Sequence, residues 1–205
     1  MLKARIAVLV SGGGTNLQAL FDAQDAGILK NGEITLVVSN NPNALALERA
    51  KKRGVEALAL PKTEYPTQEG FEASLRELLT ERGIELIVLA GFMRILSEHF
   101  TAAYPRRIIN VHPALIPSFC GKGFYGLRVH EAALSYGVKL SGATVHFVNE
   151  IPDGGEIILQ KAVPVRKGDT PETLQKRVME QAEWKILPRA CELVSKEIQK
   201  ERCAE

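Results

Sequence analysis

The first half of the chain alternates between short runs of consecutive apolar residues and longer segments in which apolar residues recur every three or four positions. The short runs are rich in β-branched residues, which predicts strands buried on both faces. These runs are Arg5–Val10, Ile34–Ser39, Val55–Leu60, Ile84–Ala90 and Ile108–Val111. The periodic segments predict amphipathic helices. They are Leu17–Ala26, Ala44–Arg53, Gln68–Arg82 and a short one around Ser97–Tyr104.

The second half of the chain has a different pattern. A loop rich in proline and glycine, Pro113–Gly126, leads into a predicted helix over Leu127–Tyr136. Two strand-like runs follow, Val138–Val148 and Ile157–Val165, and no helical pattern separates them. Strand-like runs joined by a turn-forming segment predict an antiparallel hairpin.

The last part of the chain is a predicted helix that begins at Thr170-Pro171-Glu172, with proline at the first helical position, and is expected to bend at Pro188. Strands and helices therefore alternate along most of the sequence. This order predicts an α/β fold with a doubly wound, mostly parallel sheet of about seven strands, a C-terminal antiparallel hairpin and helices on both faces. Without repeats or linkers, residues 1–205 are expected to form one domain.

Composition narrows the class of protein only slightly. The hydrophobic fraction of 45% and the charged fraction of 24% are ordinary for a globular domain, and the net charge of +2 gives no reason to expect nucleic acid or an anionic membrane as a partner. The cysteines, Cys120, Cys191 and Cys203, are odd in number and lack CxxC spacing, so neither a disulfide framework nor a metal site is expected. Neither a signal peptide nor an apolar run of membrane-spanning length is visible, and we expect a cytoplasmic protein.

A glycine-rich segment, Ser11–Asn16 (SGGGTN), lies between the first predicted strand and the first predicted helix. In this arrangement free backbone N–H groups and the helix dipole can receive a phosphate, and glycine allows close approach of the ligand. It is not a Walker loop, because no Gly-Lys-Ser/Thr follows, and Leu17 stands where the dinucleotide fingerprint has its third glycine. The segment therefore indicates a site for one phosphate monoester, with a tight turn that binds nothing as the alternative.

Two polar residues, Asn110 and His112, end the strand before the proline-rich loop. Residues two apart in a strand point to the same face, so an amide and an imidazole are presented side by side. In open α/β sheets, ligands bind where strands end in this way. A capping Asn and a buried core His would be the structural alternative.

A third polar candidate is Asp153, in Ile151-Pro152-Asp153-Gly154-Gly155. Such a segment is most often a turn, but we expect its loop to leave the preceding strand at the edge that carries the ligand-facing loops. A carboxylate near His112 would raise the pKa of the imidazole. Histidine, aspartate and an amide donor, without a serine or cysteine nucleophile, are suited to stabilising a tetrahedral intermediate and moving a proton.

The other candidate side chains carry weaker signals. Cys120 has no base at a recognisable spacing and is a poor candidate for a nucleophile. His146 alternates with apolar residues, which predicts an orienting or packed histidine. His99 and His130 fall on predicted helices and are expected at the surface.

The segment Ala90–Leu96 (AGFMRIL) follows the most apolar strand. Arg94 could bind a carboxylate or a heterocycle, and the apolar residues around it could form the wall of a flat pocket. Ordinary core residues at a strand exit are an equally good interpretation.

Taken together, these motifs resemble those of one family. They are SGGGTNLQ at Ser11–Gln18, LAGFMRIL at Leu89–Leu96, INVHP at Ile109–Pro113 and DGGxIILQ at Asp153–Gln160. In this order and spacing they are similar to phosphoribosylglycinamide formyltransferase, a folate-dependent enzyme of purine biosynthesis. The Asn-x-His and Asp set alone is shared with methionyl-tRNA formyltransferase and formyltetrahydrofolate deformylase.

The resemblance implies a formyltransferase-like fold and a direct attack of the substrate amine on the formyl carbon of the co-substrate, 10-formyltetrahydrofolate, through a tetrahedral intermediate and without a metal. Asn110, His112 and Asp153 would be catalytic. The implied substrate-binding residues are Gly13, Gly14, Thr15 and Asn16 for the phosphate and Glu183 for the ribose hydroxyls. The implied folate-binding residues are Gln68, Met93, Arg94, Ile95, Leu96 and Asn110. Residues 1–110 would form a Rossmann-like phosphate-binding half, and 111–205 the catalytic loops, hairpin and C-terminal helix.

Some positions depart from the family pattern. Trp184 replaces an expected histidine, Leu187 a tyrosine, Cys120 a proline or basic residue, and Gln68 an arginine. These departures affect the expected ligand pockets and not the expected chemistry.

Three other interpretations stay open at this point. A deformylase would normally carry a domain before the catalytic one, and the tRNA enzyme a further domain after it, and we expect neither here. A non-catalytic phosphate-ester-binding protein would leave the Asn, His and Asp unexplained. We expect small-molecule substrates, no nucleic acid or membrane partner, and a monomer or a homodimer.

Overall fold

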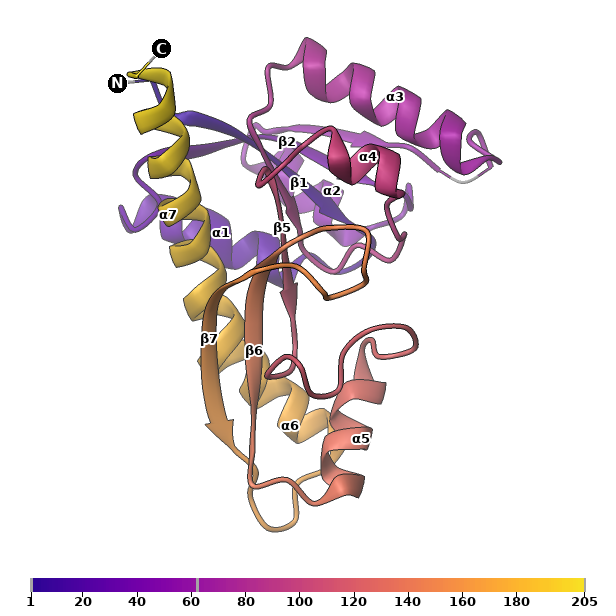
Figure 1. Cartoon of the computed structure of the whole chain (residues 1–205), viewed down its shortest axis with the longest axis vertical. Coiled ribbons are helices and arrows are strands. Elements are labelled where there is room, and N and C mark those ends of the chain that lie inside the picture. The colour runs from indigo at the N-terminus through magenta and orange to yellow at the C-terminus, as the bar shows by residue number, and fades with distance from the viewer. Residues whose placement is uncertain (1, 62, 205) are drawn as a thin grey trace.

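The computed structural model describes residues 2–61 and 63–204. Seven strands form one sheet in the order β3-β2-β1-β4-β5-β6-β7 (Figure 1). The strands are β1 (Ala4–Val10), β2 (Gly32–Ser39), β3 (Glu56–Ala59), β4 (Leu86–Leu89), β5 (Ile108–His112), β6 (Leu140–Phe147) and β7 (Ile157–Pro164). The pairings among β1 to β5 are parallel, whereas β5 with β6 and β6 with β7 are antiparallel. The predicted mixed sheet with a C-terminal hairpin is confirmed.

Helices cover both faces of this sheet. They are α1 (Thr15–Asp25), α2 (Leu45–Lys52), α3 (Gln68–Glu81), α4 (Glu98–Ala102), α5 (Leu127–Tyr136), α6 (Pro171–Val178) and α7 (Trp184–Arg202), with a π-helical turn η1 (Met179–Glu183) between the last two. Among the described residues no helix combines the length and the apolar character that crossing a membrane requires.

Alternating side chains of the strands build two cores. In β1, Ile6 and Val8 join the core formed with α1, α2 and α7, while Ala7 and Leu9 join the core formed with α3 and α4. All four are 0% exposed. Burial on both faces explains why these strands are continuous apolar runs.

The order in which successive strands are added to the sheet reverses at β1. From β1 the sheet extends through β2 to β3 on one side, and through β4 and β5 on the other. Ligands bind in α/β sheets at such a switch point, outside the carboxyl ends of the strands. The loops after β1 and β4 are joined there, because Ser11 N–H donates to the Gly91 carbonyl at 3.1 Å and Met93 N–H donates to Ser11 Oγ at 2.8 Å.

The loop that carries Asp153 does not leave its strand where we expected. Because β6 is antiparallel to β5, its last residue, Phe147, lies opposite Ile109, and Thr144 lies opposite His112. The loop therefore begins beside the start of β5 and folds back across the sheet. Gly155 packs so closely on the Phe147 carbonyl that a Cβ there would lie 1.8 Å from its oxygen.

The C-terminal helix begins at the predicted position, and its regular α-helical pattern is interrupted before Pro188. Thr170 caps α6 through a reciprocal bond with Thr173, and Pro171 occupies the first turn. Pro188 lies inside α7, one turn after the wide turn η1. Since proline has no N–H to donate and crowds the preceding turn, irregular geometry is expected here.

Candidate active site

One cavity of about 660 Å³ lies at the carboxyl edge of β1, β4 and β5. From the first half of the chain it is lined by the predicted site residues Asn16, Met93, Arg94 and Ile95. From the strand β5 onward it is lined by Asn110, His112, Asp153 and Glu183. Segments that are far apart in the sequence therefore meet at one cavity, as the predicted strand exits require.

Two of the residues predicted for folate binding lie elsewhere. Leu96 is buried in the core under α3 and α4, and Gln68 lines a neighbouring hollow of about 920 Å³ between those helices. That hollow is larger than the cavity, but its walls hold none of Asn110, His112 and Asp153. The smaller cavity is therefore the candidate active site.

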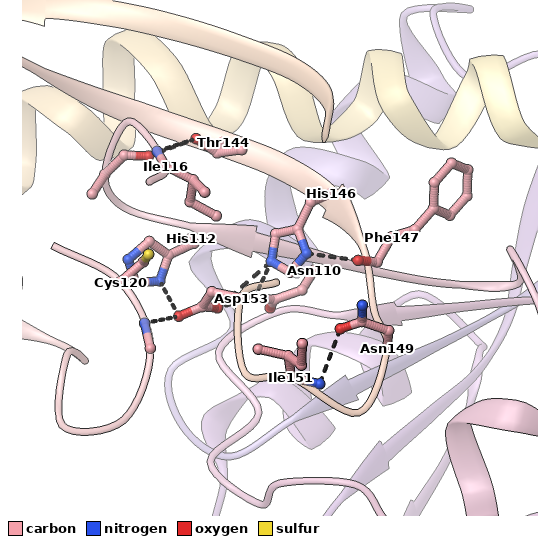
Figure 2. A network of polar contacts seen from close by, with 12 residues as sticks. Asn110, His112, Ile116, Cys120, Thr144, His146, Phe147, Asn149, Ile151 and Asp153 are labelled. Atoms are coloured by element: carbon pink, nitrogen blue, oxygen red, sulfur yellow. Dashed lines mark hydrogen bonds and ion pairs between the residues drawn. The ribbon is translucent and has the colours of Figure 1, made fainter. Parts of the chain in front are cut away.

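His112 is 4% exposed and has a polar partner at each ring nitrogen, of which Figure 2 shows the contact with Asp153. Its Nε2 lies 2.8 Å from the carbonyl oxygen of Phe119, and its Nδ1 lies 3.4 Å from Asp153 Oδ2. A carbonyl oxygen can only accept, so Nε2 carries a proton in this arrangement. An imidazolium would satisfy both contacts at once.

The pKa of His112 lies below the ordinary value of histidine. Burial lowers the pKa of the imidazole, and the charge of Asp153 together with the Phe119 carbonyl raises it again only in part. The contribution of Asp153 has the expected sign. The net shift is nevertheless downward, because desolvation of the charged form outweighs the attraction.

Asp153 is held in its position from several sides. Its Oδ2 accepts a hydrogen bond from the Gly121 N–H at 2.8 Å, and its Oδ1 lies 3.6 Å from His146 Nε2. Burial alone would raise the pKa of this carboxyl, but His146, His112 and the Gly121 N–H outweigh it, so the pKa lies below its usual value. Asp153 also has a positive φ of 58°, which is uncommon for a residue other than glycine.

Asn110 lies beside both of these residues. Its Nδ2 is 3.2 Å from His146 Nε2 and 3.4 Å from Asp153 Oδ1 (Figure 2). His146 Nδ1 donates to the carbonyl of Phe147 at 2.7 Å, which fixes the ring with its Nε2 toward the amide of Asn110 and the carboxylate of Asp153. His146 is therefore both packed and orienting.

The glycine-rich loop has the geometry of an anion site. The first hydrogen bond of α1 runs from Gln18 N–H to the Gly14 carbonyl, so the N–H groups of the three preceding residues have no partner within the helix. No side chain caps α1 and its first turn contains no acidic residue. Gly14 has a φ of 70°, and a Cβ there would lie 2.7 Å from the Cβ of Ala46. Glycine is thus required at this position for the turn and for packing on α2.

Asn16 and Glu183 form a buried pair next to this loop. Asn16 Nδ2 donates to Glu183 Oε2 at 2.7 Å, and Asn16 Oδ1 has no partner among the described residues. Burial raises the pKa of the Glu183 carboxyl, and the bond from Asn16 lowers it in part. The pair offers acceptor oxygens to hydroxyl groups in the cavity.

The guanidinium of Arg94 lies on one wall of the cavity, between an aromatic ring and an amide. Its guanidinium carbon lies 3.9 Å from the centre of the Phe71 ring, and Nη2 donates to Gln68 Oε1 at 3.3 Å. The amide nitrogen of Gln68 donates to Glu72 at 2.6 Å and to the Ile95 carbonyl at 2.9 Å. Gln68 therefore contacts the protein with both ends of its amide and supports Arg94.

His130 was expected at the surface, and this prediction was wrong. It is 0% exposed and lines the cavity, and neither ring nitrogen has a partner among the described residues. Burial and the nearby His112 lower the pKa of His130 to about 4. Helix α5 packs against α6, which periodicity alone does not reveal. His99 is exposed, as expected.

The sequence profile of the formyl transferase family matches residues 4–191. The chain belongs to the formyl transferase family. It is 40% identical over 178 residues to "Phosphoribosylglycinamide formyltransferase, chloroplastic" of Arabidopsis thaliana, which covers 86% of this chain and 61% of the plant protein. It is 44% identical over 194 residues to "Trifunctional purine biosynthetic protein adenosine-3" of Bos taurus, which covers 94% of this chain and 18% of the bovine protein. The chain thus spans less than two thirds of these relatives.

A solved structure of a family member is similar over nearly its full length. Glycinamide ribonucleotide transformylase 1 from Symbiobacterium toebii superposes with a TM-score of 0.88 at 43% identity, covering 95% of this chain and 89% of that chain. Phosphoribosylglycinamide formyltransferase from Brucella melitensis gives a TM-score of 0.86 at 38% identity, covering 94% and 96%. The formyltransferase-like fold is therefore confirmed.

Three departures from the formyl transferase pattern can now be placed. Trp184 and Leu187 do not line the cavity, and Leu187 is fully buried in the core under α7. Cys120 donates to the Pro117 carbonyl at 3.3 Å, and burial and the charge of Asp153 raise the pKa of its thiol. A raised pKa disfavours the thiolate, which argues against Cys120 as a nucleophile.

Proposed function

We propose that this protein transfers the formyl group of 10-formyltetrahydrofolate to the amine of 5-phosphoribosylglycinamide, a step of de novo purine biosynthesis. The observation that carries the proposal is the shared cavity, which Asn110, His112 and Asp153 line together with Asn16 and Glu183. A proton-transfer group and a ribose-binding pair beside a phosphate loop suit a phosphorylated amine substrate. Similarity to proteins named for this reaction supports the same choice.

The ribonucleotide binds along the first half of the cavity in this proposal. The N–H groups of Gly13, Gly14, Thr15 and Asn16 receive its 5′-phosphate, and the dipole of α1 favours the negative charge. Glu183 and Asn16 Oδ1 accept hydrogen bonds from the ribose hydroxyls. Binding at these points holds the amine toward His112, and positioning of this kind can supply a large part of the acceleration of a two-substrate reaction.

The folate binds along the second wall. Met93 and Ile95 are 56% and 66% exposed, which leaves apolar surface for a flat ring. Arg94 Nη1 is buried without a partner among the described residues and offers a donor to the co-substrate. Gln68 and Leu96, which we expected to bind folate directly, act through Arg94 and through the core.

The chemistry needs no covalent enzyme intermediate. The amine attacks the formyl carbon, and the oxyanion accepts hydrogen bonds from Asn110 and protonated His112. Asp153 favours the imidazolium, and the amine proton passes to the folate nitrogen that leaves. The Phe119 carbonyl now occupies His112 Nε2, so this contact has to open before that nitrogen can reach a formyl oxygen.

Residues 1–110 supply the phosphate-binding half, and 111–205 the catalytic loops, hairpin and C-terminal helix. The partners are small molecules, without nucleic acid or membrane, and the protein is a cytoplasmic monomer or homodimer. No metal takes part, and in the described residues no group of three or more metal-ligating side chains is arranged around a common point. Sedimentation analysis would test the oligomeric state.

An initial-rate assay tests the proposal. Purified protein is given 10-formyltetrahydrofolate with phosphoribosylglycinamide, with its dephospho analogue, or with no amine. We expect rapid transfer to the ribonucleotide, much slower transfer to the analogue and slow hydrolysis. Equal rates for the two amines would show that the glycine loop binds no phosphate, and rapid hydrolysis without amine would indicate a deformylase.

A further inference from the structure

The side chain of Arg49, on α2, binds the backbone of the glycine-rich loop. Its Nε donates to the Gly13 carbonyl at 2.9 Å, and its Nη1 donates to Gln18 Oε1 at 3.1 Å. One residue earlier, the Gly12 carbonyl accepts from the Ala46 N–H at 3.1 Å. Helix α2 therefore binds two successive carbonyl groups of the loop, one through its backbone and one through the Arg49 side chain.

These two bonds decide where the loop's N–H groups point. In a trans peptide the C=O and the following N–H point in opposite directions. Because the Gly12 and Gly13 carbonyls are turned toward α2, the N–H groups of Gly13 and Gly14 are turned away from it. Gly12 and Gly13 are exposed and have no side chain that could hold this orientation. Arg49 supplies the bond that the loop cannot make by itself.

We infer that Arg49 is a positioning residue for the phosphate subsite, an inference that rests on the proposed function. Arg49 touches no substrate atom in this assignment. It fixes the peptide between Gly13 and Gly14 with its N–H toward the phosphate. Its positive charge also lies against a carbonyl oxygen, which weakens the repulsion between that oxygen and an approaching anion.

The shape of the guanidinium matters for this role. Arg49 joins the loop to Gln18 in the first turn of α1, and Gln18 Nε2 continues the chain of bonds to Asp22 Oδ1 at 2.8 Å. These bonds therefore fix the loop and the first turn of α1 relative to one another. A lysine keeps the charge but lacks the fork that makes two bonds in fixed directions.

The test compares Arg49→Met and Arg49→Lys with a matched control, Arg53→Met. Arg53 lies directly after α2, pairs with Asp25 at 2.6 Å and stacks over Phe21, but makes no bond to the loop. The readouts are the Kd for ribose 5-phosphate by calorimetry, the KM for phosphoribosylglycinamide with kcat, and the KM for 10-formyltetrahydrofolate. Amide NMR shifts of Gly13 and Gly14 report the loop directly.

We expect Arg49→Met to raise the Kd and the ribonucleotide KM by about tenfold or more, the effect of losing a charge-assisted bond. The kcat and the folate KM should change by less than about twofold, and the preference over the dephospho analogue should shrink by the same factor as the KM rises. Arg49→Lys should fall between Arg49→Met and the parent, and Arg53→Met should match the parent. Equal KM values for Arg49→Met and Arg53→Met would overturn the inference.

The failure of this inference can be told apart from the failure of the proposed function. If the parent protein binds ribose 5-phosphate with shifts at Gly13 and Gly14, and Arg49→Met weakens that binding, Arg49 positions the loop even if no formyl transfer occurs. If the parent protein formylates the ribonucleotide but Arg49→Met leaves both binding constants unchanged, only the role of Arg49 is lost. A parent protein that binds no ribose 5-phosphate also rules the inference out.

Discussion

Asp153 Oδ2 lies 3.4 Å from His112 Nδ1, although the loop that carries Asp153 leaves β6 beside the opposite end of β5. The Gly121 N–H donates to the same oxygen and holds it toward the imidazole. The left-handed backbone conformation of Asp153 costs conformational free energy, which the contacts of the surrounding loops offset. This pairing of a buried histidine with a carboxylate is the basis of the first two predictions.

Replacing His112 with alanine should lower kcat by about two to three orders of magnitude, the range for losing an oxyanion donor. The KM values should change much less, because the phosphate and folate walls are left intact. Steady-state kinetics check this, with His99→Ala as the control, since His99 is exposed on α4. Turnover near the parent's in a folded His112→Ala protein would remove His112 from the mechanism.

Replacing Asp153 with asparagine should lower the pKa of His112 further. Burial already lowers this pKa, and the charge of Asp153 opposes that effect. If the imidazolium is the active form, activity is lost as the pH rises through the pKa of His112. The variant should therefore lose activity at a lower pH than the parent.

An NMR titration of the His112 ring gives the direct measurement. Asparagine retains an oxygen for the Gly121 N–H, so the change removes mainly the charge. Identical ring pKa values in the two proteins would show that the carboxylate and the imidazole are not coupled.

Replacing Gly14 with alanine should destabilise the fold. The left-handed φ of 70° costs an alanine about 1–2 kcal/mol. The new Cβ would also lie 2.7 Å from Ala46 Cβ and 2.9 Å from Ala46 Cα, so α2 must shift. Urea unfolding should show a loss of at least about 1 kcal/mol, the lower end of that strain cost.

Gly12→Ala is the matched control for this change. A Cβ at Gly12 meets no described atom within 4 Å, and Gly12 is not among the glycines with positive φ. Its free energy of unfolding should stay within about 0.5 kcal/mol of the parent's. If both variants lost the same stability, the contact between the loop and α2 would not be the reason that position 14 is glycine.

Replacing His130 with phenylalanine should make the protein more resistant to mild acid. The pKa of His130 is about 4 in the folded protein and about 6.5 for an ordinary histidine. Between pH 6.5 and pH 4 His130 is protonated in the unfolded chain but not in the folded protein. The free energy of unfolding is therefore highest above pH 6.5 and falls as the pH drops toward 4. The difference between the two pKa values corresponds to a loss of about 3 kcal/mol at most in the free energy of unfolding.

Unfolding by urea at pH 7.5 and pH 5 measures this effect. The parent should lose stability between the two values, and His130→Phe should lose less. His99→Phe is the control, since it removes an exposed histidine on α4. An equal loss in the parent and in His130→Phe would show that His130 does not bind the additional proton on unfolding.

Much of the fold followed from local patterns. Apolar runs such as Arg5–Val10 and Ile84–Ala90 became central strands, and the periodic segments between them became helices on both faces. Parallel strands have their carboxyl ends at one edge, so the motifs after β1, β4 and β5 could be expected to meet there. Asn16, Arg94 and His112, which follow these three strands, line one cavity at this edge.

Three features depended on residues distant in the sequence, and local patterns could not reveal them. The direction from which Asp153 arrives depends on β6 running against β5, since a carboxylate on a turn has no preferred partner. His130 is buried although it lies on a helix, since α5 packs against α6, and helical periodicity shows which residues share a face but not what covers it.

The net pKa of His112 is likewise a tertiary property, since it is the difference between the cost of burial and the attraction of Asp153. The sequence alone therefore determined the strands, the helices and the edge of the sheet where the chemistry lies, because these depend on periodicity and chain direction. Only the tertiary structure decided how strongly each side chain is desolvated and which partner it meets, because burial and pairing depend on segments far apart in the chain.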